Sequence, residues 1–135
     1  MLYLLDTNAC TDLMQKHPQI CATVAKVELP DQTATCVIVR GEILYGIQRL
    51  PMGKRRAELE IKAQLVLAQM PCYELPVHVS DRYAAMKAEQ ERLGLALTDN
   101  DLWIAAICWD VRAILVSRDR DFSRISGFLV EDWTK

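Results

Sequence analysis

The feature that most constrains this chain is the apolar run Leu2–Leu5, which stops abruptly at the polar residues Asp6, Thr7 and Asn8. A short continuous apolar run closed by polar turn-forming residues predicts a buried strand. In an open α/β sheet, ligands bind just beyond the carboxyl ends of the strands. Asp6 stands at such an end, so we expect later parts of the chain to bring further functional groups to it.

Further short apolar or β-branched runs alternate with segments of helical periodicity. Strands are predicted over residues 33–37, 73–76, 113–117 and 127–130. Helices are predicted over residues 9–16, 18–27, 38–50, 54–70, 79–93 and from 98–100 to about 110. Strands that alternate with helices indicate the α/β class, with a mostly parallel central sheet covered by helices on both faces. A length of 135 residues without an internal repeat or linker predicts a single domain, 1–135.

Several helix signals are specific enough to test. Asn8 is the expected N-cap of the first helix. Gly46 lies inside a predicted helix, where glycine costs about 1 kcal/mol relative to alanine, so we expect another element to pass close to it. Gly94 is the expected C-terminal stop of the helix before it. The buried face of that helix is expected to comprise Val79, Tyr83, Met86 and Leu93.

Composition argues against several classes of protein. Charged residues make up 25% of the chain and no apolar run reaches the length of about 18 residues that a membrane span needs, so no membrane segment is expected. No secretory signal pattern is apparent at the start of the sequence. The five cysteines are odd in number and form no C-x-x-C pair, which favours reduced thiols and a cytoplasmic location. The two histidines, His17 and His78, are isolated, which argues against a zinc site.

Acidic residues stand at equivalent places along this pattern, namely Asp6, Glu42, Asp101, Asp119 and Asp121. Each follows a predicted strand or lies in the first turns of a predicted helix. In a parallel sheet with right-handed crossovers, these positions lie at one edge, so the acids are expected to converge. Each acid alone also has a simpler explanation as a helix-end charge, a turn former or a solvated side chain. The recurrence of acids at equivalent places favours a shared site.

Convergence of carboxylates has a chemical consequence. Close carboxylates raise one another's pKa, and a divalent cation relieves the repulsion between them. Oxygen ligands without nearby histidine or cysteine suit Mg²⁺, with Mn²⁺ as a substitute. Such a site is suited to phosphodiester hydrolysis. Thr7, Asn8 and Ser117 are expected to orient the carboxylates or a water. The formal net charge of −2 becomes −2 + 4 = +2 once four acids are set aside, so the remaining surface does not repel a polyanion.

Basic and aromatic residues offer candidate contacts to RNA. Lys54 and Arg55 begin a predicted helix and either contact phosphates or form a solvated helix end. Arg118 and Arg120 flank the last acids and either touch phosphate or pair with those neighbouring acids. Trp103 either stacks on an unpaired base or packs in the core or at a dimer interface.

Four motifs in order resemble the PIN-domain nucleases, and among them the VapC-type toxins of toxin–antitoxin pairs. They are Leu5–Asn8, Glu42 with Leu44 and Gly46 behind it, residues 100–106, and residues 118–122 ahead of 130–133. The resemblance implies a PIN fold and a Mg²⁺- or Mn²⁺-dependent endoribonuclease that inhibits translation, with tRNA as a fitting substrate. It further implies a homodimer neutralised by a cognate VapB-type antitoxin.

The resemblance also assigns roles to individual residues. Asp6, Glu42, Asp101 and Asp119 fall on the acidic quartet of that family, and Asp121 matches an acid that some members also use. Two alternatives are a PIN-fold module that has lost catalysis and binds RNA or an antitoxin, and a phosphohydrolase of small substrates. The complete acidic set argues against the first, and the lack of a nucleophile motif or Gly-rich phosphate loop argues against the second.

Overall fold

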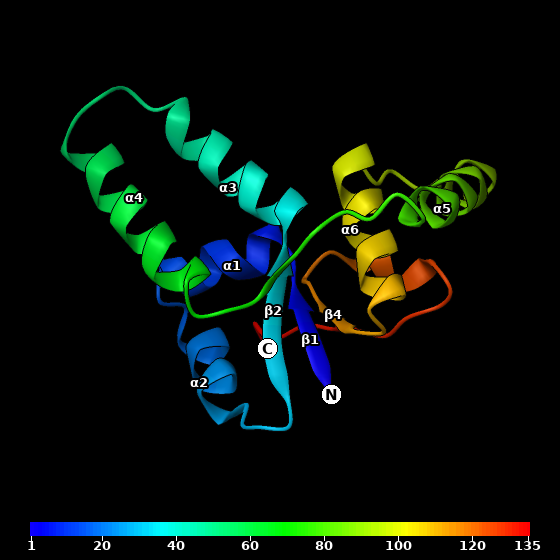
Figure 1. The fold of residues 1–135 in the computed structure, drawn as a ribbon, viewed down its shortest axis with the longest axis horizontal. Coiled ribbons are helices and arrows are strands. Elements are labelled where there is room, and N and C mark those ends of the chain that lie inside the picture. The colour runs from blue at the N-terminus through cyan, green and yellow to red at the C-terminus, as the bar shows by residue number, and fades with distance from the viewer.

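In the computed structural model, which describes residues 1–135, five strands form one sheet in the order β3-β2-β1-β4-β5 (Figure 1). All four strand pairs are parallel. The strands are β1 (Leu2–Leu5), β2 (Gln32–Cys36), β3 (Cys72–Tyr73), β4 (Ile114–Val116) and β5 (Val130–Glu131). The parallel sheet predicted from the alternation of apolar runs and helices is confirmed.

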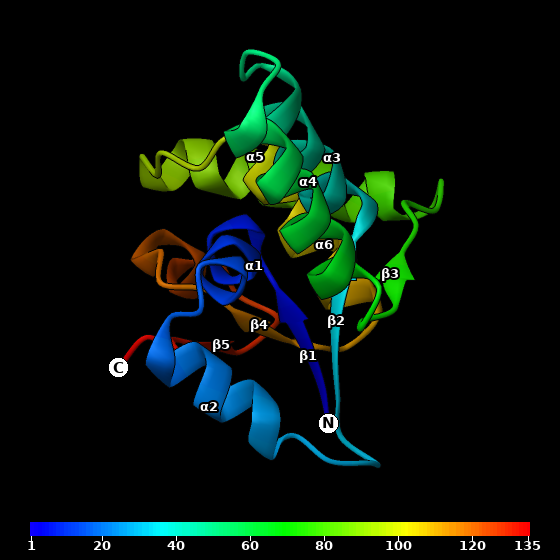
Figure 2. The same cartoon turned by 90° about the vertical axis from the view of Figure 1, so that its left-hand side faces the viewer.

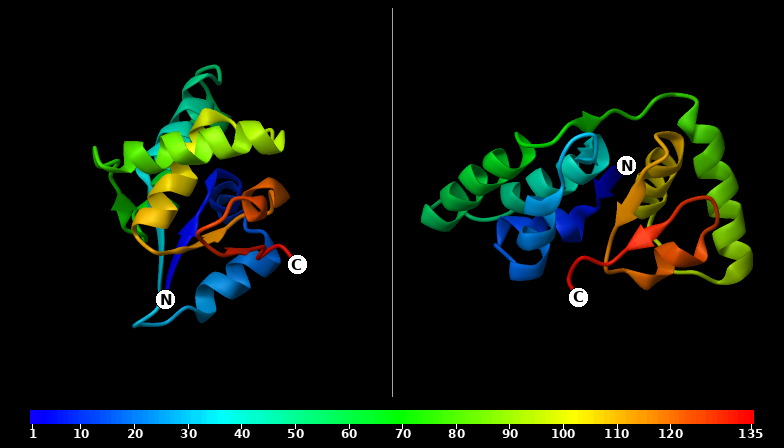
Figure 3. Two further views of the ribbon diagram at one scale, coloured as in Figure 1. Left: turned by 90° about the vertical axis from the view of Figure 1, so that its right-hand side faces the viewer. Right: turned by 90° about the horizontal axis from the view of Figure 1, so that it is seen from below.

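Six α-helices and one short 3₁₀ helix connect the strands. They are α1 (Thr7–Met14), α2 (Pro18–Lys26), α3 (Val37–Gln48), α4 (Lys54–Leu67), α5 (Val79–Leu93), α6 (Asp99–Asp110) and the 3₁₀ helix η1 (Arg120–Arg124). Helices α1 to α4 lie on one side of the sheet, as Figures 1 and 2 show, and α5 and α6 lie on the other. Figure 3 shows the yellow helix α6 from that opposite side. No helix is both long and apolar enough to cross a membrane.

The strand order contains a reversal of direction beside β1. From β1 the chain moves outward through β2 to β3, and it then returns to place β4 and β5 on the other side of β1. In an open α/β sheet, the crevice at such a reversal is the usual place for a ligand. Asp6 leaves the sheet at the end of β1, and Ser117 leaves it at the end of the neighbouring β4.

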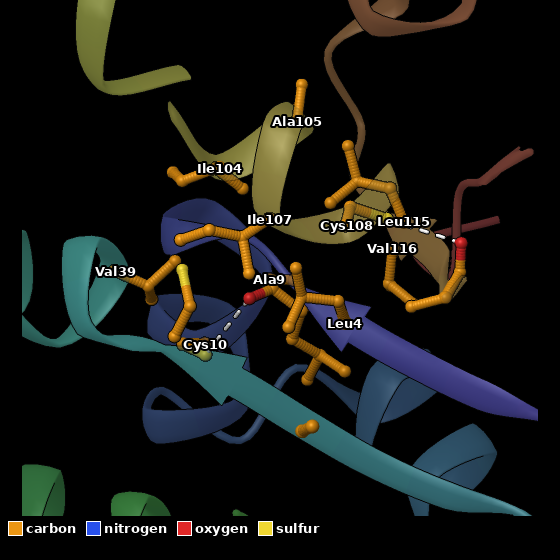
Figure 4. Packing of buried hydrophobic residues seen from close by; sticks show 14 of the residues in the cluster. Leu4, Ala9, Cys10, Val39, Ile104, Ala105, Ile107, Cys108, Leu115 and Val116 are labelled. Atoms are coloured by element: carbon orange, nitrogen blue, oxygen red, sulfur yellow. Dashed lines mark hydrogen bonds between the residues drawn. The ribbon is translucent and has the colours of Figure 1, made fainter. Parts of the chain in front are cut away.

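The core lies between the sheet and the helices on both faces. Figure 4 shows Leu4 and Leu115 of the sheet among Ile107 and Cys108 of α6 and Val39 of α3. All these side chains are buried at 1% exposure or less. Burial raises the pKa of the Cys108 thiol to about 12, so this residue serves as an uncharged core side chain. The packed core fixes the strand ends on which the polar residues stand.

Two expected helix features are wrong. Asp6, and not Asn8, is the N-cap of α1, because the Asp6 carboxylate accepts a hydrogen bond from the Ala9 N–H at 2.8 Å. The helix therefore begins at Thr7. No other element passes close to Gly46, since a Cβ at this position would meet nothing within 4 Å.

Other corrections concern where elements begin and what they bury. Val37 belongs to α3 and not to the preceding strand. The last strand covers 130–131 in place of 127–130. Leu93 is 54% exposed, although Val79 and Met86 of the same helix are buried as predicted. Gly94 has a left-handed conformation with φ of 68° and ends α5, as its position indicates.

Candidate active site

Asp6 is the most buried acid at the carboxyl edge of the sheet, with 4% of its surface exposed. Its N–H donates to the Val116 carbonyl of β4 at 3.1 Å, and its carboxylate caps α1 through the Ala9 N–H. The residue is thus fixed both by the sheet and by the helix that follows. This double attachment leaves the carboxylate little freedom to move away from the edge.

Ser117 and Asp119 continue from the end of β4 beside Asp6. The buried Ser117 hydroxyl oxygen accepts a hydrogen bond from the Asp119 N–H at 3.0 Å. The Asp119 carboxylate in turn accepts from the Asp121 N–H at 2.9 Å and caps η1. The Ser117 side chain also lies close to Asp6 and lowers its pKa. Ser117 therefore connects the acid that follows β1 with the acid that follows β4.

Glu42 reaches the same edge from α3. The Thr7 hydroxyl donates to Glu42 Oε1 at 2.7 Å, which joins the first turn of α1 to the middle of α3. Glu42 is half-buried. Because Thr7 directly follows Asp6, this hydrogen bond places the Glu42 carboxylate beside the N-terminus of α1.

Asp101 comes from the opposite side of the sheet, in the first turn of α6. Its N–H donates to the hydroxyl of Thr98, the N-cap of α6, at 3.2 Å. The carboxylate is half-buried. Since α6 runs antiparallel to the strand that follows it, its N-terminus lies at the carboxyl edge of the sheet.

These four acids influence one another electrostatically. Burial raises the pKa of Asp6 to about 6, and the charges of Asp101 and Asp119 add to the rise against the hydrogen bonds from Ser117 and Ala9. Burial also raises the pKa of Asp101, with further contributions from the charges of Glu42 and Asp119. We call Asp6, Glu42, Asp101 and Asp119 the acidic cluster.

Asp121 and Asn8 differ from the four acids in their surroundings. Asp121 forms an ion pair with Arg124 at 3.8 Å, and the charges that add to the raised pKa of Asp6 and of Asp101 come from Glu42, Asp101 and Asp119. Asn8 is exposed on α1. Between the two neighbouring acids of the last motif, Asp119 is therefore the one that faces the other carboxylates.

The basic residues named from the sequence occupy different environments. Arg55 is exposed and lines, with Thr7 and Glu42, a groove of about 320 Å³ between α1, α3 and α4. Lys54 is exposed and pairs with Glu58 at 3.9 Å. Arg120 is exposed and forms no ion pair.

Arg118 and Trp103 have intramolecular partners. Arg118 pairs with Asp12 of α1 at 3.4 Å, so the alternative of pairing with its neighbouring acids is wrong. Trp103 stacks on Tyr83 of α5 with ring centroids 3.8 Å apart, which agrees with a packing role for the indole. Asp12 was not expected from the sequence to matter. The only signal for it is its place on a helix among buried residues.

The donor set of the acidic cluster fits a hard divalent cation. All its donors are carboxylate oxygens, the type that Mg²⁺ and Mn²⁺ prefer. Burial and, to a smaller extent, the neighbouring carboxylates raise the pKa of Asp6 and of Asp101, and a bound cation would favour their charged forms. No three of the His, Cys, Asp and Glu side chains already have the spacing of a metal centre. The chemistry and charge of the cluster fit the ion, and coordination requires the carboxylates to turn toward it.

The parallel α/β sheet with acidic residues at its switch point is the arrangement that the resemblance to PIN domains predicts. The family model for the PIN domain matches residues 3–127, and the chain belongs to this family. It is 28% identical over 137 residues to Ribonuclease VapC2 of Rickettsia felis and 29% identical over 142 residues to Ribonuclease VapC1 of Haemophilus influenzae. Both alignments cover 100% of this chain and 100% of the relative.

Solved structures agree with this assignment. A chain in the crystal structure of VapBC2 from Rickettsia felis, bound to a DNA fragment from their promoter, superposes with a TM-score of 0.89 at 27% identity. The match covers 98% of this chain and 99% of that one. A chain of VapBC-1 from nontypeable Haemophilus influenzae superposes with a TM-score of 0.86 at 24% identity, with 100% of both chains covered. The PIN fold predicted from the sequence motifs is confirmed.

Proposed function

We propose that this protein is a metal-dependent endoribonuclease and the toxin of a type II toxin–antitoxin pair. The observation that carries the proposal is the acidic cluster, in which carboxylates from separate elements lie at the switch point of the sheet. Burial raises the pKa of Asp6 and of Asp101, and the charges of the neighbouring acids add to both rises. The similarity to proteins named ribonuclease VapC over the whole chain supports RNA as the substrate.

Asp6, Glu42, Asp101 and Asp119 would hold Mg²⁺, with Mn²⁺ as a substitute. When bound, the ion supplies positive charge to a phosphate oxygen and promotes attack by water. The chain's own residues keep the carboxylates ionised and oriented. The Ser117 side chain lowers the pKa of Asp6 and so favours its charged form, and the Thr7 hydroxyl fixes one oxygen of Glu42 by a hydrogen bond.

Two exposed arginines are suited to contact the RNA backbone. Arg55 lines the groove that contains Glu42, and Arg120 follows Asp119 without forming an ion pair. An arginine side chain beside an acidic site offsets the repulsion between the carboxylates and the phosphates of RNA. We assign both residues to RNA binding. The acidic cluster itself is too negative to attract RNA without its cation.

Solved structures similar to this chain are VapBC complexes, so we propose a VapB-type antitoxin as its partner. We also propose a homodimer of this chain, which the resemblance of its sequence motifs implies. An arginine or lysine from such an antitoxin would form charge-assisted hydrogen bonds with the acidic cluster and replace the cation. Cleavage of an RNA such as tRNA would inhibit translation.

Cleavage of RNA in Mg²⁺ and in EDTA tests the proposal. We expect Mg²⁺-dependent cleavage that Asp6→Asn and Asp101→Asn each reduce by at least about a hundredfold, because each removes a ligand charge. The matched control is Asp99→Asn, since Asp99 lies on the same helix but pairs with Lys87 at 2.8 Å outside the acidic cluster. Full activity of Asp101→Asn, or equal cleavage in EDTA, would contradict the proposal. RNA binding without any cleavage would identify an inactive binding module.

A further inference from the structure

Asp12 is a buried acid that the proposed reaction does not use. It lies on α1, and 6% of its surface is exposed. Its Oδ2 atom is the one buried side-chain nitrogen or oxygen atom of the chain without a hydrogen-bond partner. A buried carboxylate requires compensation of its charge, because transfer of an isolated charge out of water is strongly unfavourable.

The compensating charge comes from Arg118. Its Nη1 atom lies 3.4 Å from Asp12 Oδ2, and 49% of the Arg118 side chain is exposed. The side chain also lines a crevice with Asp12, Asp132 and Trp133, between α1 and the C-terminal segment. Arg118 therefore joins the segment after β4 to α1, and its side chain borders the C-terminal segment.

The position of Arg118 in the sequence connects this ion pair to the acidic cluster. Its neighbour Ser117 lies close to Asp6 and lowers the pKa of that carboxyl, and its other neighbour is Asp119, whose N–H donates to the Ser117 hydroxyl. Asp6 caps the helix that carries Asp12. A shift of the segment 117–119 away from α1 would separate Asp6 from Asp119. The Asp12–Arg118 pair opposes that shift because it joins the segment directly to α1.

We propose that Arg118 is a positioning residue, which through its ion pair with buried Asp12 sets the spacing between Asp6 and Asp119 for a divalent cation. This inference rests on the proposed metal-dependent function. It replaces the expectation that Arg118 contacts RNA. A guanidinium that turned to an RNA phosphate would leave Asp12 buried without a counter-charge, so the intramolecular pair is favoured.

The test compares Arg118→Gln, Asp12→Asn and the double variant in two measurements. The first is Mn²⁺ affinity by calorimetry without RNA, and the second is kcat and KM for RNA cleavage over a range of salt. We expect each single variant to weaken Mn²⁺ binding about tenfold or more, as changes to residues that orient metal ligands do. The double variant is expected to lose no more than either single variant, because both remove the same pair. KM and its salt dependence should stay near wild type.

The controls separate positioning from RNA contact and from misfolding. Arg118→Lys, which keeps the charge, should retain most of the Mn²⁺ affinity. Arg120→Gln, in the same segment but without an ion pair, should leave Mn²⁺ affinity unchanged and raise the KM for RNA. Thermal unfolding identifies a temperature at which the variants are folded, and the binding measurements are made there. If Arg118→Gln does not fold, the double variant can still be measured, because it leaves no unpaired buried charge.

Two results would overturn the inference. One is wild-type Mn²⁺ affinity in both Arg118→Gln and Asp12→Asn. The other is a raised KM and a salt slope reduced by about one in Arg118→Gln, with Asp12→Asn unchanged, since that pattern identifies a phosphate contact. A wild-type protein that binds Mn²⁺ without cutting RNA would contradict the proposed function alone, and the Mn²⁺ comparison would still decide the role of Arg118.

Discussion

Asp6 shows how one residue joins folding to function. Its carboxylate caps α1 through Ala9, which favours the fold, and it is buried beside Asp101 and Asp119, which disfavours its charge. Both effects follow from its place directly after a buried strand. The folded protein thus keeps a destabilising charge at the carboxyl edge of the sheet, as is typical of functional sites.

Replacement of Asp6 should separate these two effects. The pKa of Asp6 is about 6 in the folded state, against an ordinary 3.8. Asp6 therefore contributes most to the free energy of unfolding below about pH 4, and this contribution is lost as the pH rises through 6. The rise corresponds to about 3 kcal/mol at most. Asp6→Asn keeps the N-cap acceptor, so it should stabilise the metal-free protein at pH 8 by up to this amount. Urea unfolding in EDTA between pH 4 and 8 measures the effect.

Asp99 provides a control in the same experiment, because its pKa is lowered where that of Asp6 is raised. Hydrogen bonds from Lys87 and Tyr83 lower the pKa of Asp99, so Asp99→Asn should not stabilise the protein at pH 8. If Asp6→Asn lost stability between pH 4 and 6 as steeply as the wild type, the raised pKa would have to belong to another group.

Sequence patterns located the acids more readily than their partners. Asp6, Glu42, Asp101 and Asp119 could be found because strand ends and helix starts recur along the chain, and topology brings such positions to one edge. The role of Asp12 could not be found, because it depends on a contact with Arg118 at the far end of the sequence. Pairing across such separations is decided by the tertiary fold.

The predicted helices and strands are all present, but most of them begin or end at a different residue from the one predicted. Helix α5 has the predicted bounds, since Gly94 provides a strong stop signal. Helix α4 ends at Leu67, three residues before the predicted end, in a stretch with no glycine or proline at the boundary. Strand β3 has two residues, because its length is set by pairing with β2 rather than by its own apolar residues.

Gly46 and Gly127 should respond oppositely to alanine. A Cβ at Gly46 would meet no atom within 4 Å, so Gly46→Ala should stabilise α3 by up to about 1 kcal/mol. Gly127 has φ of 108°, and a Cβ there would lie 2.8 Å from Trp109 Cδ1, so Gly127→Ala should destabilise the protein. Thermal unfolding of both variants tests the pair. A loss of stability in Gly46→Ala would show that an element does pack against this face of α3.

At the scale of the whole molecule, the sheet order matters more than any single contact. The reversal of direction beside β1 places α3 and α6 on opposite sides of the sheet, yet brings Glu42 and Asp101 to the same edge. The sequence predicted parallel strands but not their order, because several orders satisfy the same pattern of short apolar runs. The order is settled by packing of the helices against both faces.

The acidic cluster is proposed to form one cation site from residues that are distant in the sequence. Diffraction from crystals grown with Mn²⁺, recorded for the anomalous signal of the ion, tests whether such a site exists. We predict a Mn²⁺ peak in contact with carboxylates of Asp6 and at least one of Asp101 and Asp119, and no such peak in Asp6→Asn crystals. Mn²⁺ bound elsewhere, with the acidic cluster left empty at saturating ion, would contradict the account.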